Sequence, residues 1–393
     1  MTRRESAAPV FLAFLAMGFG DAVGPFVSLA REQFQLSNFL AQMVPLVGFA
    51  MFGLLSIPMG VYQDKKGKKF ILILGLFVML AGLLIPAIEG LSTFPVFLIT
   101  VLLLGAGATT LQVAGNPIMR DVSPQGKYSR NLSLAQFVKA IGSLSGPLIP
   151  VIAARYFGAS WKVIFPIYCA ALLVTIALMW PLEVREHRAA DHRPTSFGSA
   201  LALLKNGYVA MMVFALFLYV GAEVSVSSGI PLYLKERFAI DINRTGLAGT
   251  GLFFLALTIG RFSGGVILNW MMAKPFFVLT CVVSILGLLG VFAPSPTLVL
   301  ACFFLVGLGF ANIFPLIFSI VIDSMPEEAN ALSGLMITAI VGGAILPPIM
   351  GLVADSAHSM KMAFVVPLAA LVYIIFTAIA NRNRQSVNVA ALD

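Results

Sequence analysis

The 393-residue chain consists mainly of long apolar stretches, which short polar segments separate. A helix that crosses a bilayer needs about 20 predominantly apolar residues, and twelve stretches are long enough. The strands of an outer-membrane barrel would alternate apolar and polar positions over about ten residues, so these continuous stretches predict helices instead. The twelve expected helices cover residues 7–30, 39–62, 69–89, 93–119, 130–156, 161–181, 206–234, 244–268, 275–294, 297–323, 329–354 and 361–381.

The first stretch allows two interpretations. Met-Thr-Arg-Arg ahead of an apolar run is also the pattern of a secretory signal peptide. No small-residue cleavage site follows cleanly, and eleven more apolar stretches come later in the chain. We therefore expect an uncleaved first membrane helix.

Composition agrees with this fold class. Hydrophobic residues make up 59% of the chain and charged residues only 11%, whereas a soluble domain carries about 25% charged residues. This excludes most soluble enzymes, and the high hydrophobicity excludes disorder. The three cysteines lie inside apolar stretches and have no disulfide or metal-ligand spacing. We expect an all-α polytopic membrane protein that is not an enzyme and uses neither a metal nor a cofactor.

The basic residues are distributed unevenly between the loops. If the N-terminus is cytoplasmic, 16 of the 25 Lys and Arg residues fall inside, 7 fall outside, and Lys139 and Arg261 lie within spans. Cytoplasmic loops of membrane proteins carry such an excess. This predicts a multi-pass inner (plasma) membrane protein with both termini cytoplasmic. It also explains the net charge of +8 without a nucleic-acid partner.

The two halves of the chain resemble each other at an offset of about 200 residues. Asp21 matches Glu223 at an offset of 202, and Pro147 matches Pro348 at an offset of 201. This indicates duplication, and two parallel six-helix halves with substrate bound near the midplane are the arrangement of major facilitator transporters. The expected divisions are an N-terminal half (1–181), a cytoplasmic linker (182–205) and a C-terminal half (206–393).

The loop after the second span resembles the signature loop of the major facilitator superfamily, Gly-x-x-x-Asp-(Arg/Lys)-x-Gly-(Arg/Lys)-(Arg/Lys). The matching positions are Gly60, Asp64, Gly67 and Lys68. An acid beside cations can form a charge-assisted latch that breaks when one side of the transporter opens. An ordinary positively charged inside loop with a turn glycine is the alternative. We assign these four residues to gating, a role that says nothing of the substrate.

Further segments resemble the fucose:proton symporter family, which includes glucose/galactose and N-acetylglucosamine carriers. The resemblance covers nearly the whole chain and is strongest in the second half. The matching segments are Phe217 to Val224, Gly260 to Gly264, Asn312 to Ser319, Ile340 to Asp355, Asp21 with Pro25, Asn116-Pro117 and Leu134-Ala-Gln136. This resemblance implies a secondary transporter of monosaccharides that a proton or sodium gradient drives.

Asp21 is the first candidate for ion coupling. It lies about 21 Å along the first expected helix, and ionisable residues this deep in a membrane usually line a pathway or a relay. A structural partnership with a cation such as Lys139 is the alternative. The resemblance implies that Asp21 is the proton-responsive group.

Polar residues on the fourth and fifth spans are candidates for substrate binding. Gln112 and Asn116 share one helix face, as do Gln136 and Lys139. Planar amides beside aromatic rings suit the hydroxyls and ring faces of a sugar, although polar residues can also tie helices together. The resemblance implies that Gln136 contacts the sugar.

The chain departs from the fucose carriers at two of these positions. Gln112 stands where they have a glutamate, and Lys139 stands where they have an asparagine. One hypothesis is that Lys139 binds an acidic group on the substrate, such as the carboxylate of a sugar acid. Another is that Lys139 pairs with Asp21 and couples ion movement to conformation. A third is that Lys139 snorkels to the inner surface.

The second half supplies four more candidate residues. Glu223 precedes a Ser-rich, Gly- and Pro-containing segment that we expect to break the helix, and it either orients that break or forms a second ion site. Arg261 resembles a structural cation of the family and is assigned to gating. Asn312 and Phe314 on the tenth span are expected to line the cavity.

These observations lead to one function and one main rival, with a non-transporting membrane receptor as a distant third. The expected function is import of a monosaccharide or related sugar, neutral or acidic, by proton or sodium symport with alternating access. The rival is a major facilitator exporter of drugs or metabolites, because this fold serves both. We expect a monomer in the lipid bilayer. No Gly-x-x-x-x-Gly-Lys-(Ser/Thr) phosphate loop occurs, so ATP is not expected to drive transport.

Overall fold

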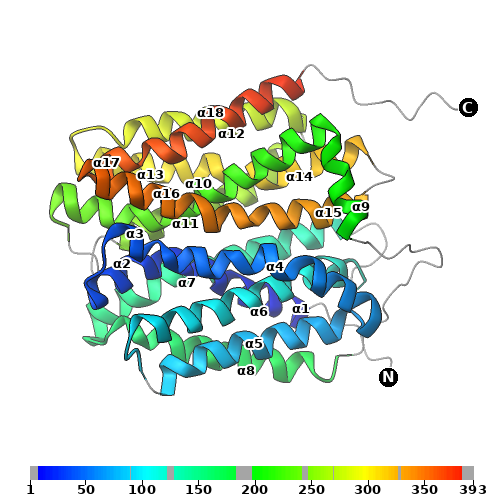
Figure 1. The fold of residues 1–393 in the computed structure, drawn as a ribbon, viewed down its shortest axis with the longest axis horizontal. Helices are drawn as coiled ribbons and strands as arrows, with labels where there is room; N and C mark the ends of the chain where they lie inside the picture. Colours follow the sequence, from blue (N-terminus) through cyan, green and yellow to red (C-terminus); the bar gives the residue numbers. More distant parts are fainter. Residues whose placement is uncertain are drawn as a thin grey trace, which may run out of the picture.

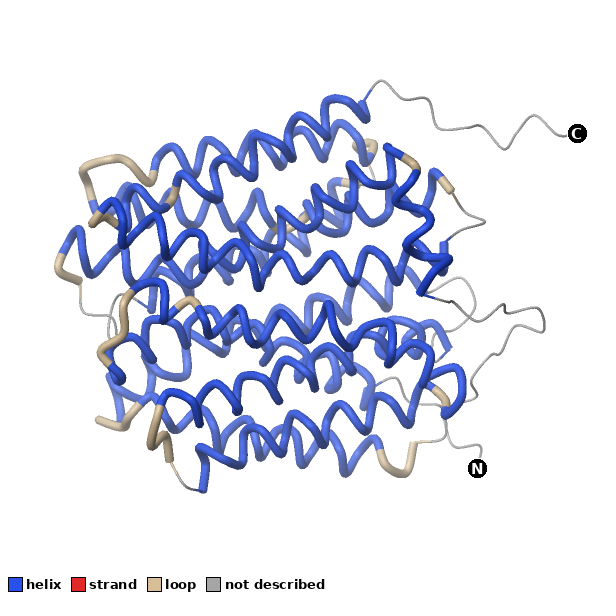
Figure 2. The backbone as a smooth tube through the Cα atoms, in the orientation of Figure 1, coloured by secondary structure: helices blue, strands red, loops and turns tan. Residues whose placement is uncertain are grey.

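The computed structural model describes residues 8–88, 90–121, 128–182, 197–240, 247–268, 270–325 and 329–382. Within these ranges all regular structure is helical, and no strand is present (Figure 2). Twelve helical segments in the described ranges are long and apolar enough to cross a membrane. This confirms the number of spans and the fold class expected from the sequence.

The first half contains six spans. The first is interrupted by a short 3₁₀ turn, and the second begins with a separate turn of helix. The elements are α1 (Ala8–Phe19), η1 (Gly20–Ala22), α2 (Val23–Phe34), α3 (Asn38–Ala41), α4 (Met43–Lys66), α5 (Lys68–Ile88), α6 (Phe94–Asp121), α7 (Tyr128–Phe157), η2 (Trp161–Val163) and α8 (Ile164–Met179).

The second half contains the other six. Most of the expected linker (182–205) lies outside the described residues, and its last part forms α9 and η3. The elements are α9 (Phe197–Ala202), η3 (Leu203–Lys205), α10 (Gly207–Phe238), α11 (Leu247–Ile267), α12 (Ala273–Gly290), α13 (Pro296–Phe310), α14 (Ile313–Ser324), α15 (Ala329–Thr338), η6 (Ala339–Val341), α16 (Gly342–Ala357), α17 (Met360–Ala363) and α18 (Val365–Arg382).

The halves lie side by side, with the helices of both running in roughly the same direction across the view (Figure 1). The contacts that join them include those of α4 with α16, of α7 with α11, and of α2 with α10. The offset of about 200 residues relates α4 to α11 and α7 to α16. The first two contacts are therefore equivalent, and the third joins the equivalent first spans of the two halves. This arrangement agrees with a duplicated six-helix unit.

Glycines allow equivalent helices to approach closely within each half. A side chain at Gly105 on α6 would meet the Gly48 Cα of α4 at 2.8 Å. Its equivalent Gly307 on α13 faces α11, where an added side chain would meet Ala256 Cβ at 2.8 Å. Small residues at helix crossings are the usual way in which membrane helices pack backbone to backbone. The repeat seen in the sequence is therefore a repeat of packing as well.

Proline explains why the first span is interrupted. Pro25 has no backbone N–H, so the carbonyl four residues earlier, that of Asp21, receives no helical hydrogen bond from it. The chain turns through η1 at this point and resumes as α2. A 3₁₀ segment inside a long helix often marks a functional hinge, and here it contains the carboxylate singled out from the sequence.

The sequence predicted a helix break after Glu223. This prediction is wrong, because α10 runs without interruption from Gly207 to Phe238. Pro231 would leave the carbonyl of Ser227 without its helical partner. The hydroxyl of Thr250 on α11 donates to that carbonyl at 3.2 Å. A neighbouring helix thus satisfies the backbone group that proline frees, which is how membrane helices tolerate proline.

The outer surface of the bundle is apolar, as a lipid-facing surface must be. Leu54, Phe262 and Phe376 expose 64%, 65% and 64% of their surface respectively. Such exposure of large apolar side chains would be unfavourable in water. The described chain is therefore a multi-pass membrane protein.

Hydrogen bonds across the two halves gather at the end of the bundle that carries α3 and α17, here called the distal end. The Asp355 carboxylate of α16 accepts from the Asn38 backbone N–H at 3.2 Å, from its side-chain amide at 2.7 Å and from the Phe39 N–H at 2.8 Å. Gly351 permits this approach, since a side chain there would meet the Phe39 Cα at 3.0 Å. The carboxylate of one half thus satisfies helix-start donors of the other.

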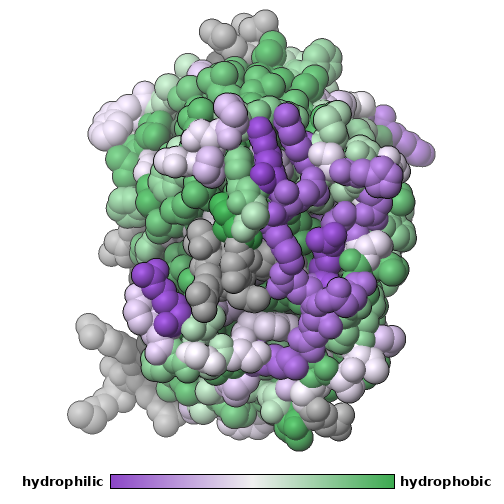
Figure 3. Space-filling view, turned by 90° about the vertical axis from the view of Figure 1, so that its left-hand side faces the viewer, coloured by the Kyte–Doolittle hydropathy of each residue, from purple (hydrophilic) through white to green (hydrophobic). Residues whose placement is uncertain are grey.

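Two more polar contacts join the halves near this end. Lys235 at the end of α10 pairs with Glu32 of α2 at 2.5 Å. Deeper in the bundle, the buried Ser228 hydroxyl donates to the buried Gln42 side-chain carbonyl at 3.1 Å. Viewed from this end, a band of hydrophilic residues runs across the molecular surface (Figure 3). The distal end is therefore held closed by polar bonds.

Candidate functional site

A central cavity of about 680 Å³, including the space open to solvent, lies between the halves. It contains four charged side chains, two amides and several aromatic rings. The lining consists of Asp21, Phe49, Phe52, Gln112, Gln136, Lys139, Val220, Glu223, Val224, Ser227, Phe254, Arg261, Phe314 and Ile340.

The first half contributes a carboxylate–ammonium pair. Asp21 projects from the η1 turn, and its Oδ2 lies 3.8 Å from the Lys139 Nζ of α7. Lys139 also donates to the Gln112 Oε1 of α6 at 3.4 Å. The Ser143 hydroxyl, one turn beyond Lys139, donates to the same Asp21 oxygen at 2.5 Å. One of the three hypotheses for Lys139 requires a contact with Asp21, and the structure contains that contact.

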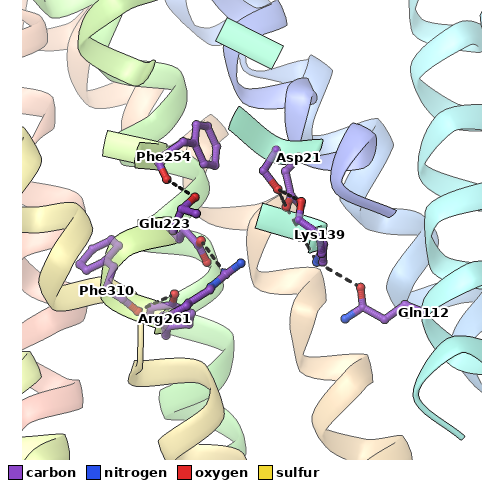
Figure 4. Close-up of polar contacts among 10 residues, drawn as sticks. Asp21, Gln112, Lys139, Glu223, Phe254, Arg261 and Phe310 are labelled. Atoms are coloured by element: carbon purple, nitrogen blue, oxygen red, sulfur yellow. Dashed lines mark hydrogen bonds and ion pairs between the residues drawn. The ribbon is translucent and has the colours of Figure 1, made fainter. Parts of the chain in front are cut away.

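The second half contributes a carboxylate–guanidinium pair, whose carboxylate is the equivalent of Asp21 but whose cation comes from a helix that is not the equivalent of α7. The Arg261 guanidinium of α11 lies 3.7 Å from the Glu223 carboxylate of α10, and these side chains are 19% and 18% exposed. Tyr219, one turn before Glu223, donates its hydroxyl to the Phe310 carbonyl at 2.9 Å. Figure 4 shows the two charge pairs on opposite sides of the cavity. The charges therefore balance within each pair and within the cavity as a whole.

Most of the predicted substrate-binding residues lie together in this cavity. Gln112, Gln136, Lys139 and Phe314 all belong to its lining. Asn116 lies on α6, and its side chain is outside the described part of the structure.

Asn312 is placed differently from the prediction. It is 6% exposed and lies in the turn between α13 and α14. Its side-chain amide donates to the Gly260 carbonyl at 2.8 Å and packs directly on Gly264 of α11. The amide therefore joins two helices behind the cavity wall instead of facing the cavity.

The predicted gating residues divide into two groups. Gly60 and Asp64 lie on α4, where Gly60 has open space around it and the Asp64 side chain is outside the described part. Gly67 ends α4 with φ of 93°, a conformation that favours glycine, and Lys68 begins α5. The latch itself stays a prediction. Arg261 belongs to the cavity lining.

Sequence reasoning missed Ser143, although a signal was available. Ser143 follows Lys139 by four residues, so both lie on one face of α7, and Ser143 is only 2% exposed. It also missed the aromatic pair of α4, Phe49 and Phe52, whose rings stack with centroids 5.8 Å apart. Among 32 phenylalanines, nothing in the sequence distinguishes these two.

Comparison with known families decides the class of protein. The Major Facilitator Superfamily model matches residues 10–348. The chain belongs to this superfamily. It is a membrane transporter of the superfamily and not an enzyme.

Relatives within the superfamily align over nearly the whole chain. A glucose/galactose transporter of Brucella abortus is 27% identical, over 93% of this chain and 91% of its own length. The L-fucose-proton symporter of Escherichia coli is 25% identical, over 91% of this chain and 88% of its own length.

Solved structures of the superfamily have the same fold. The Escherichia coli fucose:proton symporter matches with a TM-score of 0.70 at 21% identity, over 96% of this chain and 99% of that one. A bacterial homologue of the human lysosomal transporter Spinster, in an inward-facing and occupied conformation, matches with a TM-score of 0.73 at 13% identity, over 97% of each chain. The twelve-helix major facilitator fold is therefore confirmed.

Proposed function

We propose that this transporter is a symporter that imports a monosaccharide together with a proton by alternating access. The observation that carries the proposal is the Asp21–Lys139 pair at 3.8 Å inside the cavity between the halves. A proton on Asp21 would cancel its attraction for Lys139 and so change the charge that faces the substrate. The relatives named as glucose/galactose transporter and L-fucose-proton symporter support the substrate class and the coupling.

The cavity walls support a sugar substrate. Gln112 and Gln136 supply amide donors and acceptors from the first half, which suit sugar hydroxyls. Phe254 and Phe314 supply aromatic faces from the second half, against which the apolar face of a sugar ring can pack. Both halves thus contribute to one site, as alternating access requires.

The ion environment favours a proton over sodium as the coupling ion. Lys139 lies beside Asp21, and its positive charge would repel a sodium ion placed there. The described residues contain no group of three or more His, Cys, Asp or Glu side chains that could hold a metal ion. A proton needs only the one carboxylate.

A sugar acid is the second candidate substrate, and Lys139 is the observation that favours it. With Asp21 protonated, the Lys139 ammonium would lose its carboxylate partner and could bind a carboxylate of the substrate. The two candidates differ in charge movement. A neutral sugar with one proton carries one positive charge across the membrane, whereas a monoanionic sugar with one proton carries none.

Transport by the purified protein in proteoliposomes tests the proposal. Labelled glucose, galactose and L-fucose, and the matching uronates, are offered with an inward proton gradient or an inward sodium gradient. We expect proton-driven accumulation of one class, and transport currents on solid-supported membranes only if that class is neutral. Protein-free liposomes and a protonophore are the controls. Proton-driven efflux of drugs without sugar binding would replace the proposal by the exporter.

A further inference from the structure

The Asp21 carboxylate has two partners on α7, and they differ in kind. Lys139 attracts it by charge at 3.8 Å. Ser143 donates a hydrogen bond to it at 2.5 Å, a length typical of a hydroxyl bound to an ionised carboxylate. Lys139 and Ser143 are four residues apart, so one helix face presents both partners to the η1 turn.

The backbone around this contact is tightly packed. A side chain at Gly18 on α1 would meet the Gly142 Cα of α7 at 2.8 Å and the Ser143 backbone nitrogen at 2.7 Å. The two helices therefore cross backbone to backbone immediately beside the Asp21 contact. Such a crossing leaves Ser143 little room to move away from Asp21.

The Ser143 hydroxyl has a second acceptor within reach. It lies 3.2 Å from the Lys139 carbonyl of its own helix. A serine hydroxyl has a single O–H, although its oxygen can also accept. While Asp21 is ionised, the hydroxyl donates to Asp21. When a proton from the cavity binds Asp21, the carboxyl O–H can donate to Ser143, and the serine hydroxyl can turn to the Lys139 carbonyl.

We propose that Ser143 is a positioning residue, which keeps Asp21 seated on α7 in both protonation states so that protonation releases only Lys139. The inference rests on the proposed proton coupling at Asp21. The ion pair loses its attraction when Asp21 takes a proton, whereas the Ser143 hydrogen bond reverses its direction and persists. Without Ser143, the protonated carboxyl would be free to leave α7, and the proton would act less directly on Lys139.

The other groups around Asp21 do not supply this second contact. On α8, Tyr168 has its hydroxyl within 2.8 Å of the Ser145 hydroxyl. On α10 and α11, Glu223 and Arg261 pair with each other at 3.7 Å. On α4, the cavity lining consists of the apolar Phe49, Phe52 and Gly48. Ser143 is the side chain that the described structure places in hydrogen-bonding contact with Asp21.

Infrared difference spectroscopy of the reconstituted full chain across a pH titration tests the inference. A protonated-carboxyl C=O band that disappears in Asp21→Asn identifies Asp21. In Ser143→Ala we expect this band to move to higher frequency, because the carboxyl has lost a partner, and in Ser143→Thr to stay in place. Ser145→Ala is the matched control, since its hydroxyl lies on the same helix but bonds Tyr168, and we expect no shift.

Transport supplies the second measurement. In Ser143→Ala we expect proton-driven accumulation to fall about tenfold, the size expected for a lost hydrogen bond to a charged group. Substrate exchange without a gradient should change little, and Ser143→Thr should restore accumulation.

The outcomes separate the two proposals. An unshifted Asp21 band in Ser143→Ala would overturn the role of Ser143 and leave proton coupling intact. If the wild-type protein has no Asp21 band at any pH, proton coupling at Asp21 fails, and the role of Ser143 fails with it.

Discussion

The charged groups of the central cavity and those of the distal end are connected in opposite ways. In the cavity, each carboxylate pairs with a cation of its own half: Asp21 with Lys139, and Glu223 with Arg261. At the distal end, several bonds run from one half to the other, as between Asp355 and Asn38. The cavity pairs can therefore change without separating the halves, whereas the distal end cannot open without breaking its bonds.

This difference assigns two functions of a symporter, ion coupling and conformational change, to two regions of the molecule. Protonation of the carboxylate in a cavity pair changes the charge that faces the substrate and the net charge within one half. The polar bonds at the distal end contribute to the free-energy difference between the closed arrangement and one that is open there. We therefore expect cavity substitutions to alter coupling and distal substitutions to alter the conformational equilibrium.

The largest effect is expected from Asp21→Asn. Asparagine has nearly the shape of aspartate but cannot carry the proton, so gradient-driven accumulation should fall to the level of protein-free liposomes. Exchange of labelled for unlabelled substrate should remain, because it needs no net proton movement. Both are measured in the same proteoliposomes. Full accumulation by this variant would remove Asp21 from the coupling role.

Asp355→Ala should have the next largest effect, and on conformation instead of coupling. It removes the acceptor of three hydrogen bonds between the halves, and one bond to a charged group contributes about 1.5–3 kcal/mol. The closed state should therefore lose population by at least about tenfold. Electron–electron distance measurements between spin labels at Phe157 and Met362, which are exposed positions on opposite halves, should show longer distances.

Glu236→Ala is the matched control for Asp355→Ala. Its carboxylate also accepts from a backbone N–H at the start of a short helix, that of Met360 at 2.8 Å. Both of these residues belong to the second half, so this substitution should leave the distance between the halves unchanged. Equal lengthening in the two variants would mean that a bond within one half affects this distance as much as the bonds between the halves do.

Glu223→Gln should reduce stability more than its double variant with Arg261→Gln. The single change leaves the Arg261 guanidinium, which is 19% exposed, without its carboxylate, and loss of one partner costs more than loss of both. We expect the single variant to lose about 1–3 kcal/mol of unfolding free energy and the double variant to recover at least half. Thermal unfolding in detergent measures this. Additive losses would show that the pair is not coupled.

The fold was largely predictable because the bilayer imposes long apolar spans. The expected helix at 69–89 and the observed Lys68–Ile88 agree closely, as do 361–381 and Met360–Asn381. The effects of two prolines were not predictable in the same way. Pro25 accompanies an interruption of its span at η1, whereas Pro231 leaves α10 continuous, because Thr250 of another helix donates to the freed carbonyl. A contact between distant segments decides the second case, and the local sequence does not contain it.

The candidate site was predictable where charge marked it. Asp21, Lys139, Glu223 and Arg261 are rare charges within apolar spans, and all four line one cavity. Ser143 and Asn312 show the limit, since neutral polar residues occur on many helix faces. Their partners, the Asp21 carboxylate and the Gly260 carbonyl, lie on other helices. Only the packing of those helices decides which neutral polar side chain meets a partner on another helix.

The smallest effect is expected from Lys235→Ala, although its contact with Glu32 at 2.5 Å also joins the two halves. These side chains are 47% and 29% exposed, and an exposed pair contributes only about 0.2–1 kcal/mol. The label distances should therefore lengthen slightly at low salt, and the difference from wild type should vanish at about 1 M salt, where screening extends over only about 3 Å. An effect as large as that of Asp355→Ala would show that this ion pair, and not the Asp355 carboxylate, is the main bond that holds the distal end closed.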